Sequence, residues 1–345
     1  MQSVGEYHDN IESAMAAGLS QAGSRAAQPS LFDRADWLQR LKLHALVERD
    51  AMILGAKNRD GGQAWLPLIA DGKRRAVSFA NYYNFTFRPI VRNAKGAARA
   101  ALLRSVAETA RDYLDRIVLE PLPAEDGSAD ELAAAFRKAG WMVFAEPCDV
   151  NHVLEVKDRD FDTYWSARPG QLRSTVKRKA KKGIVDLRIE TEFSDADWAA
   201  YEVVYAQSWK PNEGSPDFLK SLARAEGAAG TLRLGIATID GAPVAAQFWT
   251  VENGEALIHK LAHVEDGVKA SPGTLLSHAL FRHVIDIDKV RLVDFGTGND
   301  PYKNDWMEDV RERHRLICVR PTCLSNWRTI AGALWRGLAA RRTAD

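Results

Sequence analysis

Apolar residues recur along the first half of the chain with two different periods, which predict a mixture of helices and strands. Apolar positions spaced three or four residues apart predict helices at 37–46, 97–112 and 129–139. Runs that alternate, or that are continuously apolar between turn residues, predict strands at 51–58, 64–69, 76–79 and 116–122. The aromatic stretch 81–91 contains Pro89 and suits a loop or a pocket wall better than a central strand.

The second half of the chain shows the same mixture. Strands are predicted at 152–156, at 185–193 and, as three consecutive strands, over 231–264. Helices are predicted on either side of Pro169-Gly170, at 195–209 and at 274–286. Each half therefore predicts a helix-flanked, largely antiparallel sheet of similar size. We expect an α+β fold that contains a structural duplication.

The length of the chain sets the expected number of domains. A chain of 345 residues exceeds the usual size of one hydrophobic core, and an apolar content of 46% supports well-filled cores. Residues 1–30 are rich in Ala, Ser, Gln and Gly and lack a sustained apolar period, so a disordered tail is expected there. We predict an N-terminal domain at 31–150, a C-terminal domain at 151–320 and an amphipathic helix at 321–345.

Charge, cysteines and segment hydropathy restrict the class of protein. The net charge is +1, so the chain as a whole is not a polyanion binder, and no nucleic-acid partner is expected. Cys148, Cys318 and Cys323 cannot all pair within one chain, and their spacing is not that of common zinc sites, which predicts a reduced, metal-free interior. No apolar run approaches the roughly 18 residues of a membrane span. We expect a soluble, cytoplasmic protein.

Reactive polar groups gather at 294–306, directly after an apolar strand. Gly296 and Gly298 permit a tight turn that would present Tyr302 and Lys303 at the end of this strand. The sequence therefore predicts the edge of an active site here.

A second candidate feature lies about twenty residues upstream, where a helix follows a strand. Ser271 can cap this helix, and Pro272 suits its first position. Gly273 would let a phosphate approach the N–H groups of Thr274 and Leu275. A well-capped helix without a ligand is the alternative.

The order of these and neighbouring motifs resembles a known family. The segments SARPGQLRSTVKRKAKKG, YAQSWKPNEGSPDF, GAPVAAQFWTV, ALIHKLAHV, SPGTLLSHAL and VDFGTGNDPYKNDW follow one another in the second half. This order resembles the BioF2-like or CelD-like branch of the GNAT acetyltransferases, relatives of the FemAB transferases. The resemblance runs from about 151 to 320, and NYYNFTFRP looks like the family's N-terminal half. It implies tandem GNAT-like domains and acyl transfer, usually from acetyl-CoA to an amine.

Acetyl transfer from a thioester needs an acid for the departing thiolate and a route for the amine's proton. With the resemblance in view, Tyr302 would protonate the thiolate and Lys303 would neutralise developing negative charge. Asp294 and His259 are the candidate bases. In the alternative interpretation Asp294 caps a turn, Tyr302 packs, Lys303 is a solvated charge and His259 is a packed strand residue.

The segment 163–185 contains no acidic residue and is strongly basic. Family position favours Arg173 and Arg178 as ligands of the coenzyme phosphates. A solvated helix, or an RNA or membrane contact, are the alternatives for this segment.

The acceptor side is expected in two other segments. Trp209 and Lys210 look like a family loop near the acceptor, with a surface turn as the alternative. Asn81, Tyr82 and Tyr83 would add an aromatic wall from the N-terminal domain. The amphipathic helix at the end of the chain either touches an anionic membrane surface weakly or docks on the body of the protein.

Together these features predict an acetyl-CoA-dependent N-acetyltransferase that uses no metal. Its acceptor would be the amine of a sugar or polysaccharide precursor in cell-envelope or exopolysaccharide biosynthesis, in the cytoplasm or at the inner membrane. A FemAB-type transferase that uses aminoacyl-tRNA is the rival enzyme. A non-catalytic RNA- or membrane-binding protein is the rival of another class.

Overall fold

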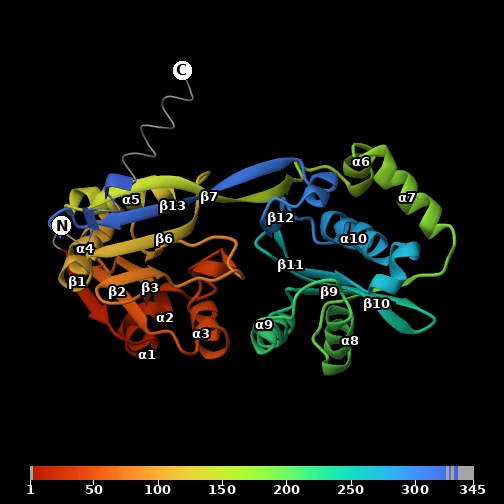
Figure 1. Cartoon of the computed structure of the whole chain (residues 1–345), viewed down its shortest axis with the longest axis horizontal. Helices are drawn as coiled ribbons and strands as arrows, with labels where there is room; N and C mark the ends of the chain where they lie inside the picture. The colour runs from red at the N-terminus through yellow and green to blue at the C-terminus, as the bar shows by residue number, and fades with distance from the viewer. Residues whose placement is uncertain (1–2, 324–325, 328–329, 333–345) are drawn as a thin grey trace, which may run out of the picture. The chain divides into compact units, whose positions relative to one another are not determined.

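The computed structural model describes residues 3–323, 326–327 and 330–332, and it divides into two compact units (Figure 1). The first unit comprises Met1–Asp149 and Arg311–Asp345, and the second comprises Val150–Val310. Each unit is a mixed sheet flanked by helices, which confirms the predicted α+β class. Strand β7 (Met142–Glu155) begins in the first unit and ends in the second.

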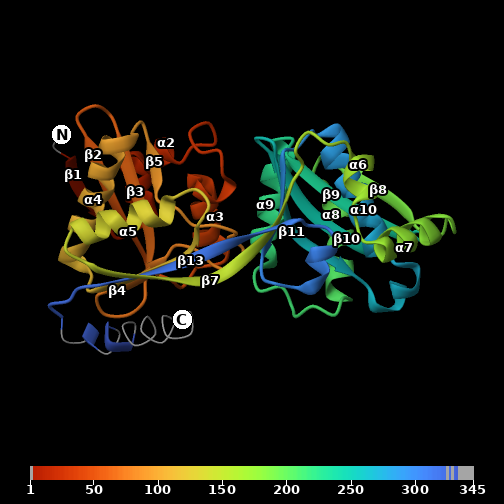
Figure 2. The same cartoon turned by 90° about the horizontal axis from the view of Figure 1, so that it is seen from above.

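In the first unit the strands follow the order β1-β2-β3-β4-β6-β13-β7, and β5 pairs with β3. The bounds of these strands are β1 (Ser3–His8), β2 (Ala51–Asn58), β3 (Gln63–Ala70), β4 (Arg75–Ser78), β5 (Ile90–Arg92), β6 (Arg116–Pro123) and β13 (Asp309–Val319). The helices are α1 (Ile11–Ala14), α2 (Ser20–Ala22), α3 (Ala35–His44), α4 (Gly96–Tyr113) and α5 (Ser128–Lys138). Helix α4 lies on the sheet because Leu103, Val106 and Ala110 form a buried face at helical spacing (Figure 2).

The N-terminal segment differs from the expected disordered tail. Strand β1 pairs antiparallel with β2, and Ile11, Ala14 and Leu19 are buried. Composition misled the prediction because the helical segment is interrupted at Gly18, whose φ is 131°. The interruption leaves too few turns for an apolar period to show.

In the second unit the strand order is β7-β12-β11-β10-β9-β8. The bounds are β8 (Asp186–Glu190), β9 (Leu232–Ile239), β10 (Ala242–Glu252), β11 (Glu255–His263) and β12 (Leu292–Thr297). The helices are α6 (Phe161–Ser166), α7 (Gly170–Ala180), α8 (Asp195–Ala206), α9 (Pro216–Ala228) and α10 (Pro272–Arg282), with short helical turns η3 (Glu265–Ala270), η4 (His283–Ile287) and η5 (Pro301–Asp305). Helices α8 and α9 lie on one face of the sheet, and α10 lies on the other (Figure 1).

Two predicted boundaries differ from the structure. Strand β13 was not predicted, and it pairs with β6, so the second unit ends at Val310 and not at residue 320. Helix α9 was not predicted either. The predicted helix at 321–345 falls largely outside the described residues.

Candidate functional site

The parallel strands β11 and β12 pair only where they begin. Glu255–Leu257 lie opposite Leu292–Asp294, whereas β11 continues to His263 and β12 to Thr297. Beyond this point β11 pairs with β10 and β12 pairs with β7. In the part of the chain that the structure describes, no ladder hydrogen bonds join the two strands past Leu257. The strands therefore separate at their carboxyl ends, where helix α10 begins.

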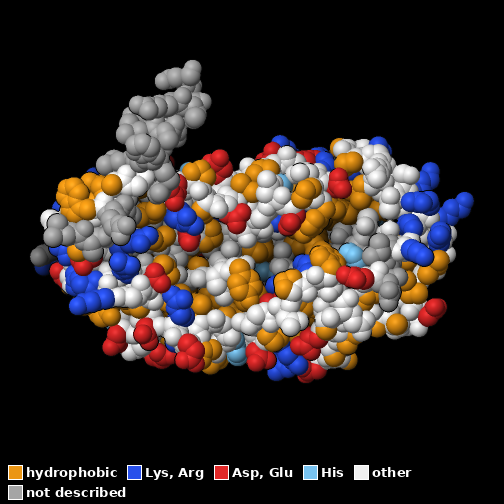
Figure 3. All heavy atoms as spheres, viewed as in Figure 1, with side chains coloured by type: hydrophobic (Ala, Val, Ile, Leu, Met, Phe, Trp, Pro, Cys, Tyr) orange, Lys and Arg blue, Asp and Glu red, His pale blue; other side chains and the backbone are white. Residues whose placement is uncertain are grey.

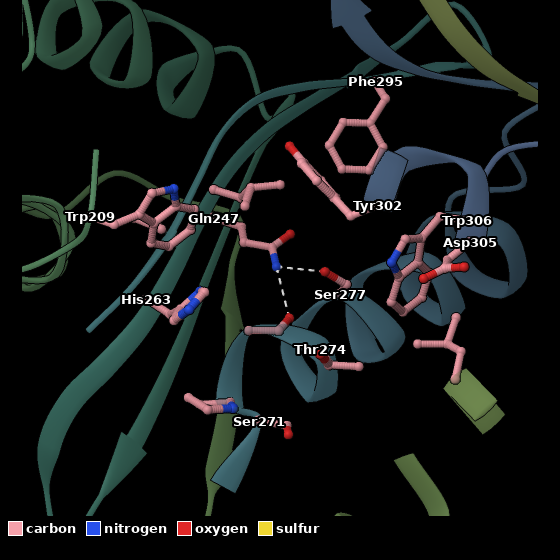
Figure 4. Close-up of a pocket in the computed structure, with 15 residues that line it drawn as sticks. Trp209, Gln247, His263, Ser271, Thr274, Ser277, Phe295, Tyr302, Asp305 and Trp306 are labelled. Atoms are coloured by element: carbon pink, nitrogen blue, oxygen red, sulfur yellow. Dashed lines mark hydrogen bonds between the residues drawn. The ribbon is translucent and has the colours of Figure 1, made fainter. Parts of the chain in front are cut away.

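A cavity of about 380 Å³ lies at this separation (Figure 4). Its walls come from β10, β11, β12, α7, the start of α10 and η5. The residues that line it are Leu172, Trp209, Gln247, Leu261, Ala262, His263, Ser271, Pro272, Gly273, Thr274, Ser277, Phe295, Tyr302, Asp305 and Trp306. The volume is in the range of small-molecule sites, roughly 300–1,000 Å³. The motifs predicted at 271–274 and 294–306 thus meet at one cavity.

The start of α10 differs in detail from the predicted cap. Ser271 has a left-handed backbone (φ 55°, ψ 46°) and its side chain makes no capping hydrogen bond. The N–H of Leu275 donates to the carbonyl of Ser271 at 3.1 Å, so Leu275 is not a phosphate ligand. Gly273 and Thr274 line the cavity, and the first-turn N–H groups of a helix have no intrahelical acceptor. The helix dipole adds partial positive charge there. The site therefore retains the properties that bind phosphate.

The buried side chain of Gln247 fixes the start of α10 to strand β10. Its Nε2 donates to the carbonyl of Gly273 at 3.1 Å and to Ser277 Oγ at 2.8 Å (Figure 4). Its Oε1 accepts a hydrogen bond from Trp249 Nε1 at 3.0 Å. Gln247 was not predicted as a site residue, although its place within the apolar segment AAQFWTV was a signal in the sequence.

Tyr302 lines the cavity, as predicted for an acid. Its ring packs edge-on against Phe295, with the ring centroids 5.6 Å apart. Its hydroxyl end points away from Trp306, toward the side of the cavity where Trp209 lies (Figure 4). Burial raises the pKa of Tyr302 to about 12, and Asp300 adds to the effect. The phenol therefore remains protonated at neutral pH and can donate its proton.

The structure does not bring the side chain of Lys303 into the cavity, where a catalytic role was predicted for it. Its side chain is 3% exposed and does not line the cavity. Nζ donates to the carbonyls of Gly296, Thr297 and Gly298 at 3.2, 2.6 and 3.0 Å. Lys303 therefore holds the loop between β12 and η5 in one conformation, and this conformation positions the neighbouring Tyr302.

We expect Lys303→Met to lower the free energy of unfolding by about 2–4 kcal/mol, because three carbonyls lose a charged donor. Urea denaturation measures this change, with the exposed Lys138→Met as the matched control. A variant of parental stability that lost all transferase activity would contradict the structural role.

Asp294, one of the two predicted bases, lies in strand β12. Its carboxylate is 7% exposed and does not line the cavity. It accepts two hydrogen bonds from Asn151 Nδ2, at 3.1 and 3.0 Å, and one from the N–H of Gly296 at 2.8 Å. Asp294 therefore organises the turn after β12, as in the alternative interpretation.

His259 does not face the cavity because a β-bulge changes the alternation of strand β11. Phe248 pairs with Lys260 and Trp249 pairs with Ile258, which leaves His259 as the extra residue. Its Nε2 lies 2.8 Å from Thr250 Oγ1, and burial lowers the pKa of His259 to about 3. The structure therefore does not bring His259 into the cavity, where a base was predicted.

His263, at the end of the same strand, does line the cavity and was not predicted as a site residue. Its ring lies 4.3 Å from the ring of Trp209, measured between centroids. Burial, together with Lys210, lowers the pKa of His263, so the imidazole is largely neutral at pH 7. A neutral imidazole can accept a proton.

The basic segment forms helix α7, which packs along α10. Arg173 and Arg178 are exposed and do not line the cavity. Lys179 donates a hydrogen bond to the carbonyl of Lys269, three residues before α10 begins. Lys and Arg side chains gather over α7 (Figure 3). The basic helix is thus close to the cavity, while the binding of coenzyme phosphates by the two arginines remains a prediction.

The predicted acceptor residues fall into different places. Trp209 is 48% exposed and lines the cavity, whereas Lys210 lines a second cavity and its Nζ lies 5.7 Å from the centroid of the Trp209 ring. Asn81, Tyr82 and Tyr83 lie in the first unit between β4 and β5, and the Tyr82 hydroxyl donates to that of Tyr83 at 3.0 Å. Their contribution to an acceptor pocket remains a prediction.

The buried amino group of Lys210 is expected to make the stability of the protein depend on pH. Burial, with Lys260 nearby, lowers the pKa of Lys210 from 10.5 to about 8. The unfolded chain therefore binds more protons between these pH values, and stability rises as pH increases from about 8 to 10.5. Lys210→Met removes the cost of burying the charge, so we expect it to be more stable than the parent by about 1–3 kcal/mol at pH 7.

Denaturation at several pH values measures this difference, with the exposed Lys182→Met as control. The gain from Lys210→Met should shrink between about pH 8 and 10.5 and disappear above this range, where the parent lysine is neutral in both states. A gain that is independent of pH would show that packing, and not charge, is responsible.

Two further findings concern metals and membranes. Within the described residues, no group of three or more His, Cys, Asp or Glu side chains is arranged to hold a metal ion. Among the helices that the structure describes, none combines the length and the apolar character needed to cross a bilayer.

A family model matches a large part of the second unit. Residues 166–304 match the family model described as the acetyltransferase (GNAT) domain. The separated parallel strands and all the residues that line the cavity except Asp305 and Trp306 lie within this match, which supports an acyltransferase. No curated protein matches the chain.

Solved structures show the same fold over almost the whole chain. FemX is 12% identical with a TM-score of 0.61, and the match covers 92% of this chain and 97% of that one. The C-terminal domain of a protein described as a lysylphosphatidylglycerol synthetase, from Agrobacterium fabrum, is 14% identical with a TM-score of 0.57, over 88% and 92% of the two chains. L-PGS from Bacillus licheniformis is 14% identical with a TM-score of 0.53, over 90% and 97%. At these identities the likeness is one of fold alone.

The first unit repeats the main feature of the second. Strands β4 and β6 are parallel, and the chain between them contains α4, as β11 and β12 are parallel with α10 between them. This correspondence fits the predicted duplication. The particular CelD-like branch of the family is not established by these comparisons.

Proposed function

We propose that this protein is an acyl-CoA-dependent N-acyltransferase, with the reaction carried out in the second unit. The observation that supports this most directly is the cavity between β11 and β12, where the start of α10 and Tyr302 face the same space. The end of the cavity at the start of α10 suits a diphosphate, and the end at Tyr302 suits a thioester.

The lining of the cavity fits an acyl-CoA donor. Gly273 leaves room for a phosphate at the first turn of α10, because even an added Cβ would meet no side-chain atom closer than 3.4 Å. Leu172, Leu261 and Phe295 provide apolar walls that suit the uncharged arm of the coenzyme. The exposed cations of α7 would lie near its phosphates.

In the proposed reaction the neutral amine of the acceptor attacks the thioester carbonyl. The C–N bond forms, the C–S bond breaks, and the departing thiolate takes a proton from the Tyr302 hydroxyl. The proton lost by the amine passes to water or to His263, whose neutral imidazole lines the same cavity. That proton returns to Tyr302 through solvent, so the net products are the amide and free coenzyme A.

For the finer function we propose acetyl transfer to the amine of a sugar or polysaccharide precursor. The order of motifs that resembles the CelD-like branch supports this, and the exposed ring of Trp209 at the cavity offers a surface on which a sugar ring can stack. The expected location is the cytoplasm or the inner membrane surface.

The second candidate is a FemAB-type transferase that takes its acyl group from aminoacyl-tRNA. The basic exposed face of α7 favours it, because such a face suits a polyanion. The fold shared with FemX and with the lysylphosphatidylglycerol synthetase domain is compatible with it.

Calorimetry with acetyl-CoA separates the two donors, and release of free thiol over a panel of amino sugars and nucleotide-linked sugars tests the reaction. We expect binding and thiol release with at least one amine. Absence of acetyl-CoA binding, together with aminoacyl-tRNA-dependent transfer, would replace the proposed donor. Polyanion binding without thiol release would favour the non-catalytic alternative.

A further inference from the structure

A further cavity, of about 890 Å³, lies in the first unit at the start of helix α4. One wall is formed by residues 24 and 26–29, between α2 and η2 (Leu31–Asp33), and the other by residues 91–96 and 99, from β5 into α4. The two walls meet because α2 contacts β5 (Figure 2). All the lining residues belong to the first unit, so this α4 cavity, as we name it, is distinct from the cavity at the start of α10.

The charged residues that line the α4 cavity are all cations, namely Arg92, Lys95 and Arg99. Arg99 pairs with Glu131 at 2.6 Å, whereas Arg92 and Lys95 have no carboxylate partner within the described residues. Arg92 Nη1 donates to the neutral amide oxygen of Gln21 at 3.4 Å. The charges of two side chains are therefore not offset, and the cavity favours an anion.

The first turn of α4 adds to this positive character. The helix is 18 residues long, and the first N–H groups of a helix have no intrahelical acceptor. The side chain of its N-cap residue, Lys95, makes no capping hydrogen bond, and the first turn contains no acidic residue. The helix dipole places partial positive charge there. An added Cβ at Gly96 would meet no atom within 4 Å, so a phosphate has room to approach the backbone.

Gln28, on the other wall, presents an unsatisfied acceptor to the α4 cavity. Its side chain is buried, with the residue 8% exposed, and its Nε2 donates to the carbonyls of Ala22 and Val91 at 2.8 and 3.1 Å. Because these bonds use both amide hydrogens, Oε1 is the polar atom left for the cavity, and it has no hydrogen-bond partner in the described part of the chain. Buried polar groups are almost always satisfied, so this oxygen indicates a ligand that carries a hydroxyl or amino hydrogen.

The two walls together define the chemistry of the ligand. Inorganic phosphate would satisfy the cations and leave Gln28 without a partner, whereas an uncharged sugar would do the reverse. We propose that the α4 cavity binds a nucleoside diphosphate, with its phosphates beside Arg92, Lys95 and the start of α4, and with a hydroxyl or amino group that donates to Gln28 Oε1. The volume lies within the roughly 300–1,000 Å³ of small-molecule sites. The site belongs to the first unit and does not depend on the reaction proposed for the second.

Calorimetry with ADP and UDP tests the inference. Adenosine and uridine are matched ligands that lack the phosphates, and pyrophosphate is a matched ligand that lacks the nucleoside. We expect at least one nucleoside diphosphate to bind, and its nucleoside and pyrophosphate each to bind at least about tenfold more weakly, because each lacks one of the two sets of contacts. Binding of neither diphosphate, or equal binding of the nucleoside or of pyrophosphate, would overturn the inference.

Arg92→Met and Lys95→Met locate the ligand. Each removes a cation that has no carboxylate partner, so we expect each to weaken diphosphate binding by about tenfold or more while the Tm stays near that of the parent. The exposed Lys73→Met, between β3 and β4, is the matched control and should bind as the parent does. Parental affinity in both Arg92→Met and Lys95→Met would place the ligand elsewhere.

Gly273→Asp separates this site from the one at the start of α10, which also suits a diphosphate. The substitution places a carboxylate in the second unit, so it should leave binding of ADP and UDP at the α4 cavity unchanged. Loss of this binding in Gly273→Asp, together with parental binding in Lys95→Met, would overturn the α4 cavity and assign the diphosphate to the second unit.

Discussion

Gly273→Asp is expected to abolish binding of the acyl-CoA donor without weakening the fold. An added Cβ at Gly273 meets His263 Nδ1 at 3.4 Å, which is an ordinary contact, and the backbone at this position is helical. A carboxylate in the first turn of a helix stabilises it by about 0.3–1 kcal/mol. The same carboxylate would occupy the place proposed for a phosphate and would repel it.

We therefore expect a loss of acetyl-CoA affinity of at least about 100-fold, which corresponds to roughly 3 kcal/mol. Calorimetry measures the affinity and thermal denaturation measures the fold. Gly273→Ala separates size from charge and should retain most of the affinity. Donor binding that survives in a folded Gly273→Asp protein would show that the diphosphate does not lie at the start of α10.

Tyr302→Phe is expected to lower kcat by about 10²-fold or more while the affinity for acetyl-CoA stays close to parental. Phenylalanine keeps the edge-on packing against Phe295 and removes only the proton donor. Because burial raises the pKa of Tyr302 to about 12, the parent enzyme should not lose activity through this residue below about pH 10.

Steady-state thiol release across pH gives kcat, and calorimetry gives donor affinity. Tyr113→Phe, in the first unit, is the matched control and should behave as the parent. If Tyr302→Phe retained parental kcat, water or another group would have to protonate the thiolate.

The sequence predicted the place of the site better than the roles of its side chains. The start of α10 and the segment after β12 were both found, because Pro272, Gly273 and Gly298 carry backbone information that is readable locally. Lys303 was misassigned because the turn after β12 bends its side chain back onto three carbonyls. Residue type alone does not give the direction of a side chain that follows such a turn.

Other errors came from features that depend on partner strands. His259 would share a face with His263 in a regular strand, and the bulge that prevents this is visible only in the pairing with β10. Strand β13 was not predicted because its first half is charged and its polar and apolar residues alternate weakly. It is identified as a strand by its pairing with β6 in the structure.

Under the proposed function, Gln247 has a consequence for changing the acyl donor. The amide side chain of Gln247 holds the first turn of α10 in place through hydrogen bonds to Gly273 and Ser277. Leu172 and Leu261 line the same cavity with apolar side chains that form no hydrogen bonds. Anchoring of the coenzyme and tolerance for longer acyl chains would thus depend on separate residues. Shortening either leucine should then widen the cavity for a bulkier thioester, while the contacts to the nucleotide end of the donor persist.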